Sequence, residues 1–118
     1  MTIIQTSYFA KYKGENAVSI SLSKPNWYQC REYKKLAPTW DLLNKYKRDK
    51  DEDYYIGCYY REVLSKLNPQ QVYDELGENA VLLCWEKNSD FCHRHLIAEW
   101  LENHLGIEVR EYIKEGAK

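Results

Sequence analysis

The chain has 118 residues, which suits one domain with its own hydrophobic core and is short for two. With 17 basic and 18 acidic residues the net charge is −1, so the chain lacks the basic excess of a protein that lives on duplex DNA. No apolar run approaches the roughly 18 residues needed to cross a bilayer. Residues 1–9 lack the charged start and cleavage site of a secretory signal. We therefore expect a cytoplasmic protein without a membrane partner.

The cysteine and aromatic contents narrow the class further. The four cysteines (Cys30, Cys58, Cys84 and Cys92) are widely spaced, so we expect free thiols rather than a disulfide framework. Eleven Tyr and 4 Trp stand against 2 Phe. Aromatic rings with a polar group suit the wall of a pocket, and they equally suit the half-buried edge of a small core. Composition leaves both uses open.

Two strands are predicted in the first part of the chain. Residues 2–9 are rich in β-branched and aromatic side chains, and residues 17–23 alternate apolar with serine side chains. Their relative direction stays open, because the connection is short for a parallel crossover. A mixed stretch follows to Ala37, which precedes a proline. Thr39 is then expected to cap a helix, and the charged run at 47–53 to form its solvated end and a loop.

Two further helices are predicted between residues 53 and 77. The first begins at Asp53 and repeats large apolar and aromatic side chains every four residues. The members of this stripe are Tyr55, Tyr59, Val63 and Leu67. Asn68 and the proline after it favour a new helix start, and Gly77 is a natural helix end.

A strand, a helix and a strand are predicted at the end of the chain. Residues 80–85 form a continuous apolar run, which is typical of a strand buried on both faces. Residues 93–105 carry apolar side chains at helical spacing, and residues 107–113 alternate as a strand does. Such a βαβ unit has parallel strands. The expected fold class for residues 1–118 is a single α/β domain, with a small, mostly parallel sheet of about four strands flanked by helices.

The best candidate site follows the buried strand and runs from Cys84 to Arg94. Ligands of open α/β sheets bind at the carboxyl ends of the strands. Cys92, His93 and Arg94 fall in the first turn of the expected helix, where free N–H groups and the helix dipole favour anions and a thiolate. Cations are unfavourable at this helix end, so their presence indicates function. Arg94 and the free N–H groups would form a receptor for a phosphate or carboxylate.

More specific chemistry stays open at this stage. Glu86 could act as a general base or position Arg94. Cys92 could be a nucleophile beside Arg94, while Cys84 is equally well explained as part of the core. Cys84, Glu86, Cys92 and His93 include metal-ligand types, but their spacing is not a zinc signature. We therefore expect no metal and no cofactor.

Several segments together resemble the family named domain of unknown function 488. They are residues 82–86 (LLCWE), 92–94 (CHR), 96–101 (LIAEWL), 6–9 (TSYF), 27–28 (WY) and 33–38 (YKKLAP). The last two are similar to a short bacterial and phage branch of that family. The resemblance implies an α/β fold and site positions at Cys84, Glu86, Cys92, His93 and Arg94, with no assigned reaction. Longer members carry an Asp-Val-Arg type motif where this chain has residues 19–21 (SIS), so no Asp or Arg is carried over there.

The sequence thus predicts a pocket for a small anionic ligand, such as a nucleotide or another phosphate-bearing molecule, in a hydrolase or transferase. We expect Glu86, Cys92, His93 and Arg94 to be the catalytic residues. The expected ligand-binding residues are Thr6, Ser7, Tyr8, Trp27, Tyr28, Lys34, Lys35 and Cys84. The alternative is a non-catalytic module that binds single-stranded nucleic acid or a protein, with a structural Cys-His-Arg motif; net charge does not favour nucleic acid. Whether the chain is an enzyme, and its oligomeric state, are left open.

Overall fold

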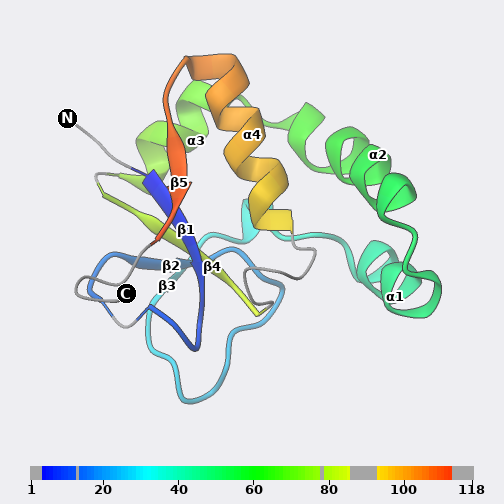
Figure 1. The fold of residues 1–118 in the computed structure, drawn as a ribbon, viewed down its shortest axis with the longest axis horizontal. Helices are drawn as coiled ribbons and strands as arrows, with labels where there is room; N and C mark the ends of the chain where they lie inside the picture. Colours follow the sequence, from blue (N-terminus) through cyan, green and yellow to red (C-terminus); the bar gives the residue numbers. More distant parts are fainter. Residues whose placement is uncertain (1–3, 13, 78, 86–92, 113–118) are drawn as a thin grey trace.

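A parallel five-stranded sheet forms the centre of the computed structural model, which describes residues 4–12, 14–77, 79–85 and 93–112 (Figure 1). The order of the strands across the sheet is β3-β2-β4-β1-β5. The strands are β1 (Ile4–Tyr8), β2 (Ala17–Ser19), β3 (Arg31–Glu32), β4 (Val81–Cys84) and β5 (Val109–Glu111). Every neighbouring pair is parallel.

The position of β4 explains why the direction of the first two strands was ambiguous. Both β1 and β2 pair with β4, which lies between them, so they are parallel although the segment that connects them contains no described helix. All four residues of β4 are buried, as the apolar run predicted. β2 is shorter than the predicted strand at 17–23. Beyond its last residue, the Ser21 N–H turns to the Ser19 hydroxyl (3.4 Å), a local bond of the kind by which serine competes with strand pairing.

The described residues form four α-helices, and a side chain caps the start of each of the first three. The helices are α1 (Trp40–Asp49), α2 (Glu52–Glu62), α3 (Pro69–Leu76) and α4 (His93–Leu105). The Thr39 hydroxyl accepts from the Leu42 N–H (3.1 Å), and the side chains of Asp51 and Asn68 do the same for α2 and α3. Gly77 ends α3 with a positive φ of 82°, which a residue with a side chain rarely adopts.

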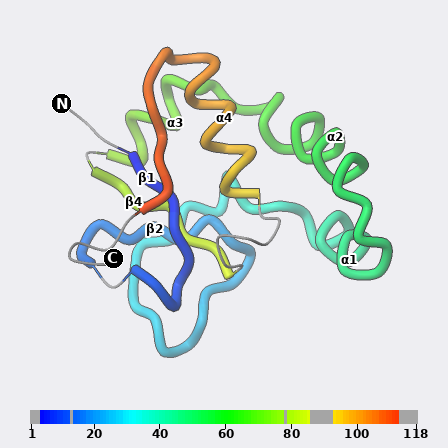
Figure 2. The backbone as a smooth tube through the Cα atoms, in the orientation of Figure 1, coloured from blue at the N-terminus to red at the C-terminus, as the bar shows by residue number. Residues whose placement is uncertain are grey.

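The helices are stacked outward from the sheet. α4 contacts β1, β4 and β5, α2 packs on α4, and α1 packs on α2. The tube in Figure 2 shows α1 and α2 as an arm that extends to one side, away from the strands. The segment after β2 and the end of β4 approach this arm, and this proximity creates the pocket described below.

Two hydrophobic clusters lie on the two sides of the sheet. The larger contains residues of all four α-helices together with Ile4, Val18 and Leu82. The smaller is formed by strand and loop residues alone among the described ones: Phe9, Tyr12, Ala17, Tyr28, Val81 and Leu83. The helices therefore cover one face of the sheet, and connecting segments cover the other. Within the described ranges no helix is long and apolar enough to cross a membrane.

The predicted fold class is confirmed, with two differences in detail. The sheet has five strands because the short β3 pairs with β2, and no alternation over two residues could have revealed it. The final strand β5 pairs with β1 rather than with β4, so β1 lies inside the C-terminal βαβ unit. Short 3-10 helices occupy Lys34–Leu36 and Leu64–Lys66; the second ends the predicted helical stripe before Leu67.

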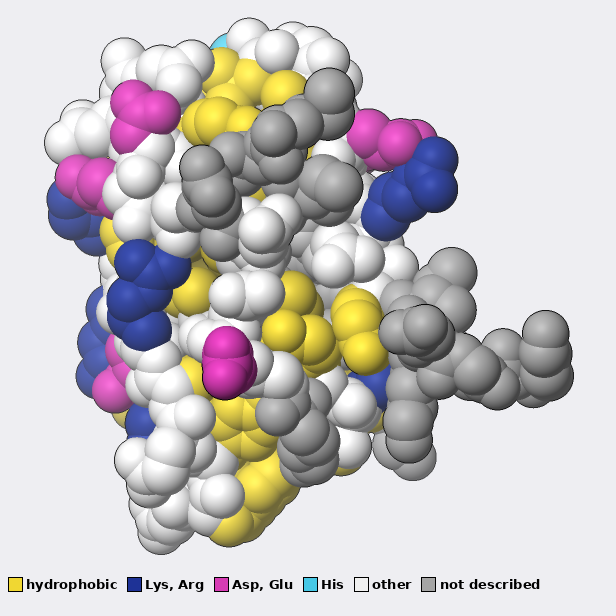
Figure 3. Space-filling model, turned by 90° about the vertical axis from the view of Figure 1, so that its left-hand side faces the viewer, with side chains coloured by type: hydrophobic (Ala, Val, Ile, Leu, Met, Phe, Trp, Pro, Cys, Tyr) yellow, Lys and Arg dark blue, Asp and Glu magenta, His cyan; other side chains and the backbone are white. Residues whose placement is uncertain are grey.

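One expectation about the cysteines is wrong. Cys30 and Cys58 are free thiols, but Cys84 is disulfide-bonded. The scattered positions of the four cysteines in the sequence therefore did not exclude a disulfide. Figure 3 shows one face of the molecule, on which basic side chains lie beside acidic ones at the margins and hydrophobic side chains run down the middle.

Candidate functional site

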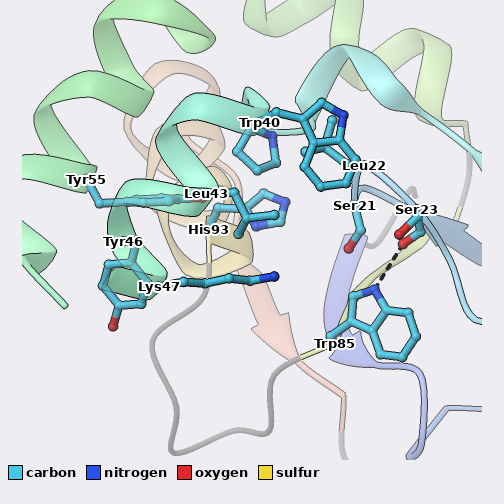
Figure 4. Close-up of a pocket in the computed structure, with 11 residues that line it drawn as sticks. Ser21, Leu22, Ser23, Trp40, Leu43, Tyr46, Lys47, Tyr55, Trp85 and His93 are labelled. Atoms are coloured by element: carbon cyan, nitrogen blue, oxygen red, sulfur yellow. Dashed lines mark hydrogen bonds between the residues drawn. The ribbon is translucent and has the colours of Figure 1, made fainter. Parts of the chain in front are cut away.

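A pocket of about 330 Å³ opens between the helical arm and the carboxyl ends of β2 and β4. This volume is near the lower end of the range for small-molecule sites, roughly 300–1,000 Å³. Figure 4 shows its lining residues. The segment after β2 contributes Ser21, Leu22 and Ser23. Pro38 precedes α1, and α1 itself contributes Trp40, Leu43, Tyr46 and Lys47. Tyr55 belongs to α2, Trp85 follows β4, and His93 is the first residue of α4.

Two half-exposed tryptophans form aromatic walls of this pocket. The exposed fraction is 58% for Trp40 and 52% for Trp85, which is high for a residue type that normally buries most of its surface. Trp85 is nevertheless held in place. Its indole N–H donates to the Ser23 carbonyl (2.9 Å), and its ring meets Phe9 edge to face at 5.5 Å between centroids. The indole face is therefore exposed and the indole orientation is fixed.

His93 forms a buried part of the lining, at the first position of α4. Its Nε2 lies 2.7 Å from the Ile20 carbonyl oxygen, which can only accept, so Nε2 carries the hydrogen. Its ring also packs edge to face with Tyr59. Burial first, and then the neighbouring cations Arg94 and His95, lower the pKa of His93 to about 4. At neutral pH His93 is therefore an uncharged imidazole.

Lys47 brings a positive charge to the same pocket. In Figure 4 its side chain extends beside His93, with its nitrogen directed toward the side of the pocket that Ser21 and Trp85 form. No described residue forms an ion pair with Lys47. Lys45, two positions earlier on α1, differs in this respect because its ammonium lies 2.6 Å from Asp49.

Arg94 lies on the other side of the α4 start, fully buried against the sheet. Its guanidinium donates to both oxygens of Glu111 (3.2 Å from Nε and 3.0 Å from Nη2), and Nη1 donates to Cys84 Sγ (2.8 Å). The Thr6 hydroxyl donates to the same carboxylate (2.6 Å), and the guanidinium carbon lies 5.8 Å from the centre of the Tyr8 ring. The charge of Arg94 is thus offset inside the protein by Glu111.

The predicted ligand-binding residues near the chain start are divided between the two faces of the sheet. Thr6 and Tyr8 lie on the same face as Arg94 and make contacts within the protein, Thr6 to Glu111 and Tyr8 to Arg94 itself. Ser7 points to the opposite face, since strand side chains alternate. Its hydroxyl is buried and has no hydrogen-bond partner among the described residues. Cys84 is fully buried at the end of β4 and contacts Arg94.

The other predicted ligand-binding residues lie away from the pocket. Trp27 is exposed and packs edge to face with Tyr28, whose hydroxyl donates to the Tyr12 carbonyl in the smaller cluster. Lys35 pairs with Glu75 at 3.1 Å, and Lys34 lies 3.9 Å from Glu32. None of these four residues lines the pocket.

Two predicted catalytic residues, Glu86 and Cys92, lie outside the described residues. Within the ranges that are described, no three His, Cys, Asp or Glu side chains are placed to share a metal ion. Of the predicted catalytic set, His93 lines the pocket and Arg94 lies behind it.

Sequence reasoning missed the contributions of Trp40, Lys47 and Trp85. The charged run from residue 47 was interpreted as a solvated helix end, although Trp40, Leu43 and Lys47 are spaced three and four residues apart and so share one face of a helix. That spacing was a usable signal. Trp85 offered one as well, because an aromatic residue directly after a buried parallel strand falls at the carboxyl edge of the sheet.

Comparison with known proteins matches most of the chain to a family model. A family model described as DUF488-N3a, the active DUF488-N3 subclade, matches residues 10–105. No curated protein and no solved structure matches the chain significantly. The matched range contains every lining residue of the pocket.

Proposed function

We propose that this chain, which belongs to the domain of unknown function 488 family, binds a small anionic molecule of the nucleotide or phosphate-bearing class in the pocket between α1 and the ends of β2 and β4. The observation that carries the proposal is Lys47, a cation that lines the pocket without an ion-pair partner among the described residues. No described carboxylate neutralises this ammonium, so it can attract an anionic ligand. Lysine commonly binds phosphate as a point charge.

The surroundings of Lys47 support an anionic rather than a cationic ligand. No Asp or Glu is among the described residues that line the pocket, and His93 is neutral at physiological pH. The hydroxyl-bearing Ser21 and Ser23 line the side toward which the ammonium is directed and can donate hydrogen bonds to anionic oxygens. The pocket also lies at the carboxyl ends of parallel strands, where open α/β sheets bind their ligands.

The catalytic part of the proposal is hydrolysis or group transfer on the bound ligand. The description of the matching family model as an active subclade favours an enzyme. With a pKa of about 4, His93 accepts protons weakly at neutral pH, so it suits a neutral hydrogen-bonding wall better than a general base. The proton-transfer role stays with Glu86 as a prediction, and the predicted nucleophilic role of Cys92 requires a reduced thiolate. Arg94 is better suited to stabilising the structure around the site than to binding the ligand, because its guanidinium is already paired with Glu111.

A non-catalytic binding module is the second candidate, because His93 and Arg94 both make hydrogen bonds within the protein, to Ile20 and Glu111. It would use the same pocket without chemistry. Incubation with each bound ligand, followed by chromatography of the products, separates the two candidates. Under reducing conditions, conversion of a ligand that depends on Glu86 or Cys92 supports the enzyme, and binding without any conversion supports the module.

Binding itself is tested by thermal shift and calorimetry with nucleotides, sugar phosphates and inorganic phosphate. Lys47→Ala should weaken the binding of phosphate-bearing ligands at least about tenfold, as expected for loss of a hydrogen bond to a charged group. Lys45→Ala is the matched control, because it removes the same charge from the same helix while its ammonium is held by Asp49. If no phosphate-bearing ligand binds, or if the two variants behave alike, the proposal is wrong.

A further inference from the structure

The walls of the pocket indicate which part of a phosphate-bearing ligand is recognised besides its charge. Two tryptophans line it with more than half of their surfaces exposed. Tyr46 and Tyr55 add a second pair of rings, which meet edge to face at 5.5 Å. Flat aromatic surfaces bind flat rings by stacking, whereas a phosphate group alone gains little from them.

Of these aromatic rings, Trp85 is held in place by a hydrogen bond and a ring contact. The Ser23 carbonyl occupies its only hydrogen-bond donor, and Phe9 packs against it edge to face at an interplanar angle of 71°. Because the ring is already held, little conformational entropy is lost when a ligand covers it. An exposed indole that is immobilised in this way has its face available for contact and no polar atom left to offer.

We infer that the ligand is a mononucleotide whose base stacks on the exposed face of Trp85, with its phosphate directed to Lys47. This inference rests on the proposed function and specifies its substrate class. The pocket, at about 330 Å³, is of a size that suits one base with its sugar and phosphate. Stacking tolerates all bases, because every base has a π-face. Selectivity among bases should therefore be weak unless other groups contribute.

The test compares ligands that differ only in the base or the phosphate. AMP, GMP, CMP, UMP, adenosine and ribose 5-phosphate are titrated by calorimetry into the wild-type protein. At least one mononucleotide should bind roughly tenfold more tightly than ribose 5-phosphate, since stacking on one ring is typically worth such a factor or more. Adenosine should bind more weakly than AMP, because it lacks the anion.

Variants of Trp85 locate the stacking contact. Trp85→Ala should weaken mononucleotide binding about tenfold and leave ribose 5-phosphate unaffected, while Trp85→Phe should retain most of the affinity because it keeps a ring. Trp27→Ala is the matched control, since Trp27 is also exposed and does not line the pocket. Circular dichroism establishes that each variant is folded.

The possible failures are distinguishable. If ribose 5-phosphate binds as tightly as the mononucleotides and Lys47→Ala weakens both, the proposed function stands and base stacking is refuted. If no phosphate-bearing ligand binds, the proposed function itself is refuted. Equal effects of Trp85→Ala and Trp27→Ala also overturn the inference. The inference is also overturned if oligonucleotides bind more tightly than mononucleotides and their affinity rises steadily with length. The ligand would then be a nucleic-acid strand.

Discussion

Lowering the pH from 7 to 4 should destabilise the folded protein through His93, in addition to the effect of the carboxylates that titrate in any protein. The ring is buried, its Nε2–H is bound to the Ile20 carbonyl, and its pKa is lowered to about 4. In the unfolded chain the same group titrates near 6.5. Between these two pH values the unfolded chain holds a proton that the folded protein excludes.

The sign and size of the effect follow from proton linkage. Because the unfolded state binds more protons, the free energy of unfolding decreases as the pH falls from 6.5 to 4. The contribution is fully present above pH 6.5, and its loss should amount to about 3 kcal/mol by pH 4. This is a large part of the 5–15 kcal/mol by which a typical domain is stable.

A glutamine at position 93 isolates this contribution. Its amide can donate to the Ile20 carbonyl as the imidazole does, and it carries no titratable proton. Urea unfolding at pH 7, 6, 5 and 4, at constant ionic strength, gives the free energy of unfolding of the wild type and of His93→Gln. The difference between them, wild type minus variant, should decrease by about 3 kcal/mol over this range.

His95 provides the control, since partial burial and Arg94 lower its pKa too. It is present in both proteins and cancels in the difference, and His95→Gln should leave most of the acid sensitivity in place. Parallel pH profiles for the wild type and His93→Gln would refute the assignment of a buried, neutral imidazole to this position.

Two further predictions concern stability at neutral pH. Arg94→Ala should lower the free energy of unfolding by about 3 kcal/mol, because it leaves the Glu111 carboxylate without its buried partner; a loss below about 1 kcal/mol in urea unfolding would contradict this role. Gly57→Ala should raise the melting temperature by stabilising α2 by about 0.5–1 kcal/mol, since the added methyl group meets no atom within 4 Å. Gly77→Ala is its counterpart and should destabilise, because φ is positive there; equal effects of the two changes would show that backbone conformation is not the cause.

The parts of this protein that the sequence alone determined are those governed by neighbouring residues. Thr39 and Asn68 cap helices because each side chain reaches an N–H three residues on. The apolar run at 80–85 predicted a buried strand, and apolar spacing with a glycine after Leu105 predicted α4. These signals act over a few residues, so no knowledge of the rest of the chain was needed.

The tertiary structure alone decided what the candidate site residues touch. Arg94 was expected to face a ligand, yet its partners are Glu111, on β5, and Cys84, on β4. Lys47 and Trp85 lie far apart in the sequence and line one pocket. Such pairings depend on the order of the strands and on how the helical arm packs, which no local pattern encodes. The sequence therefore predicted a candidate site at one edge of the sheet, and the fold determined which side chains of that edge face the pocket.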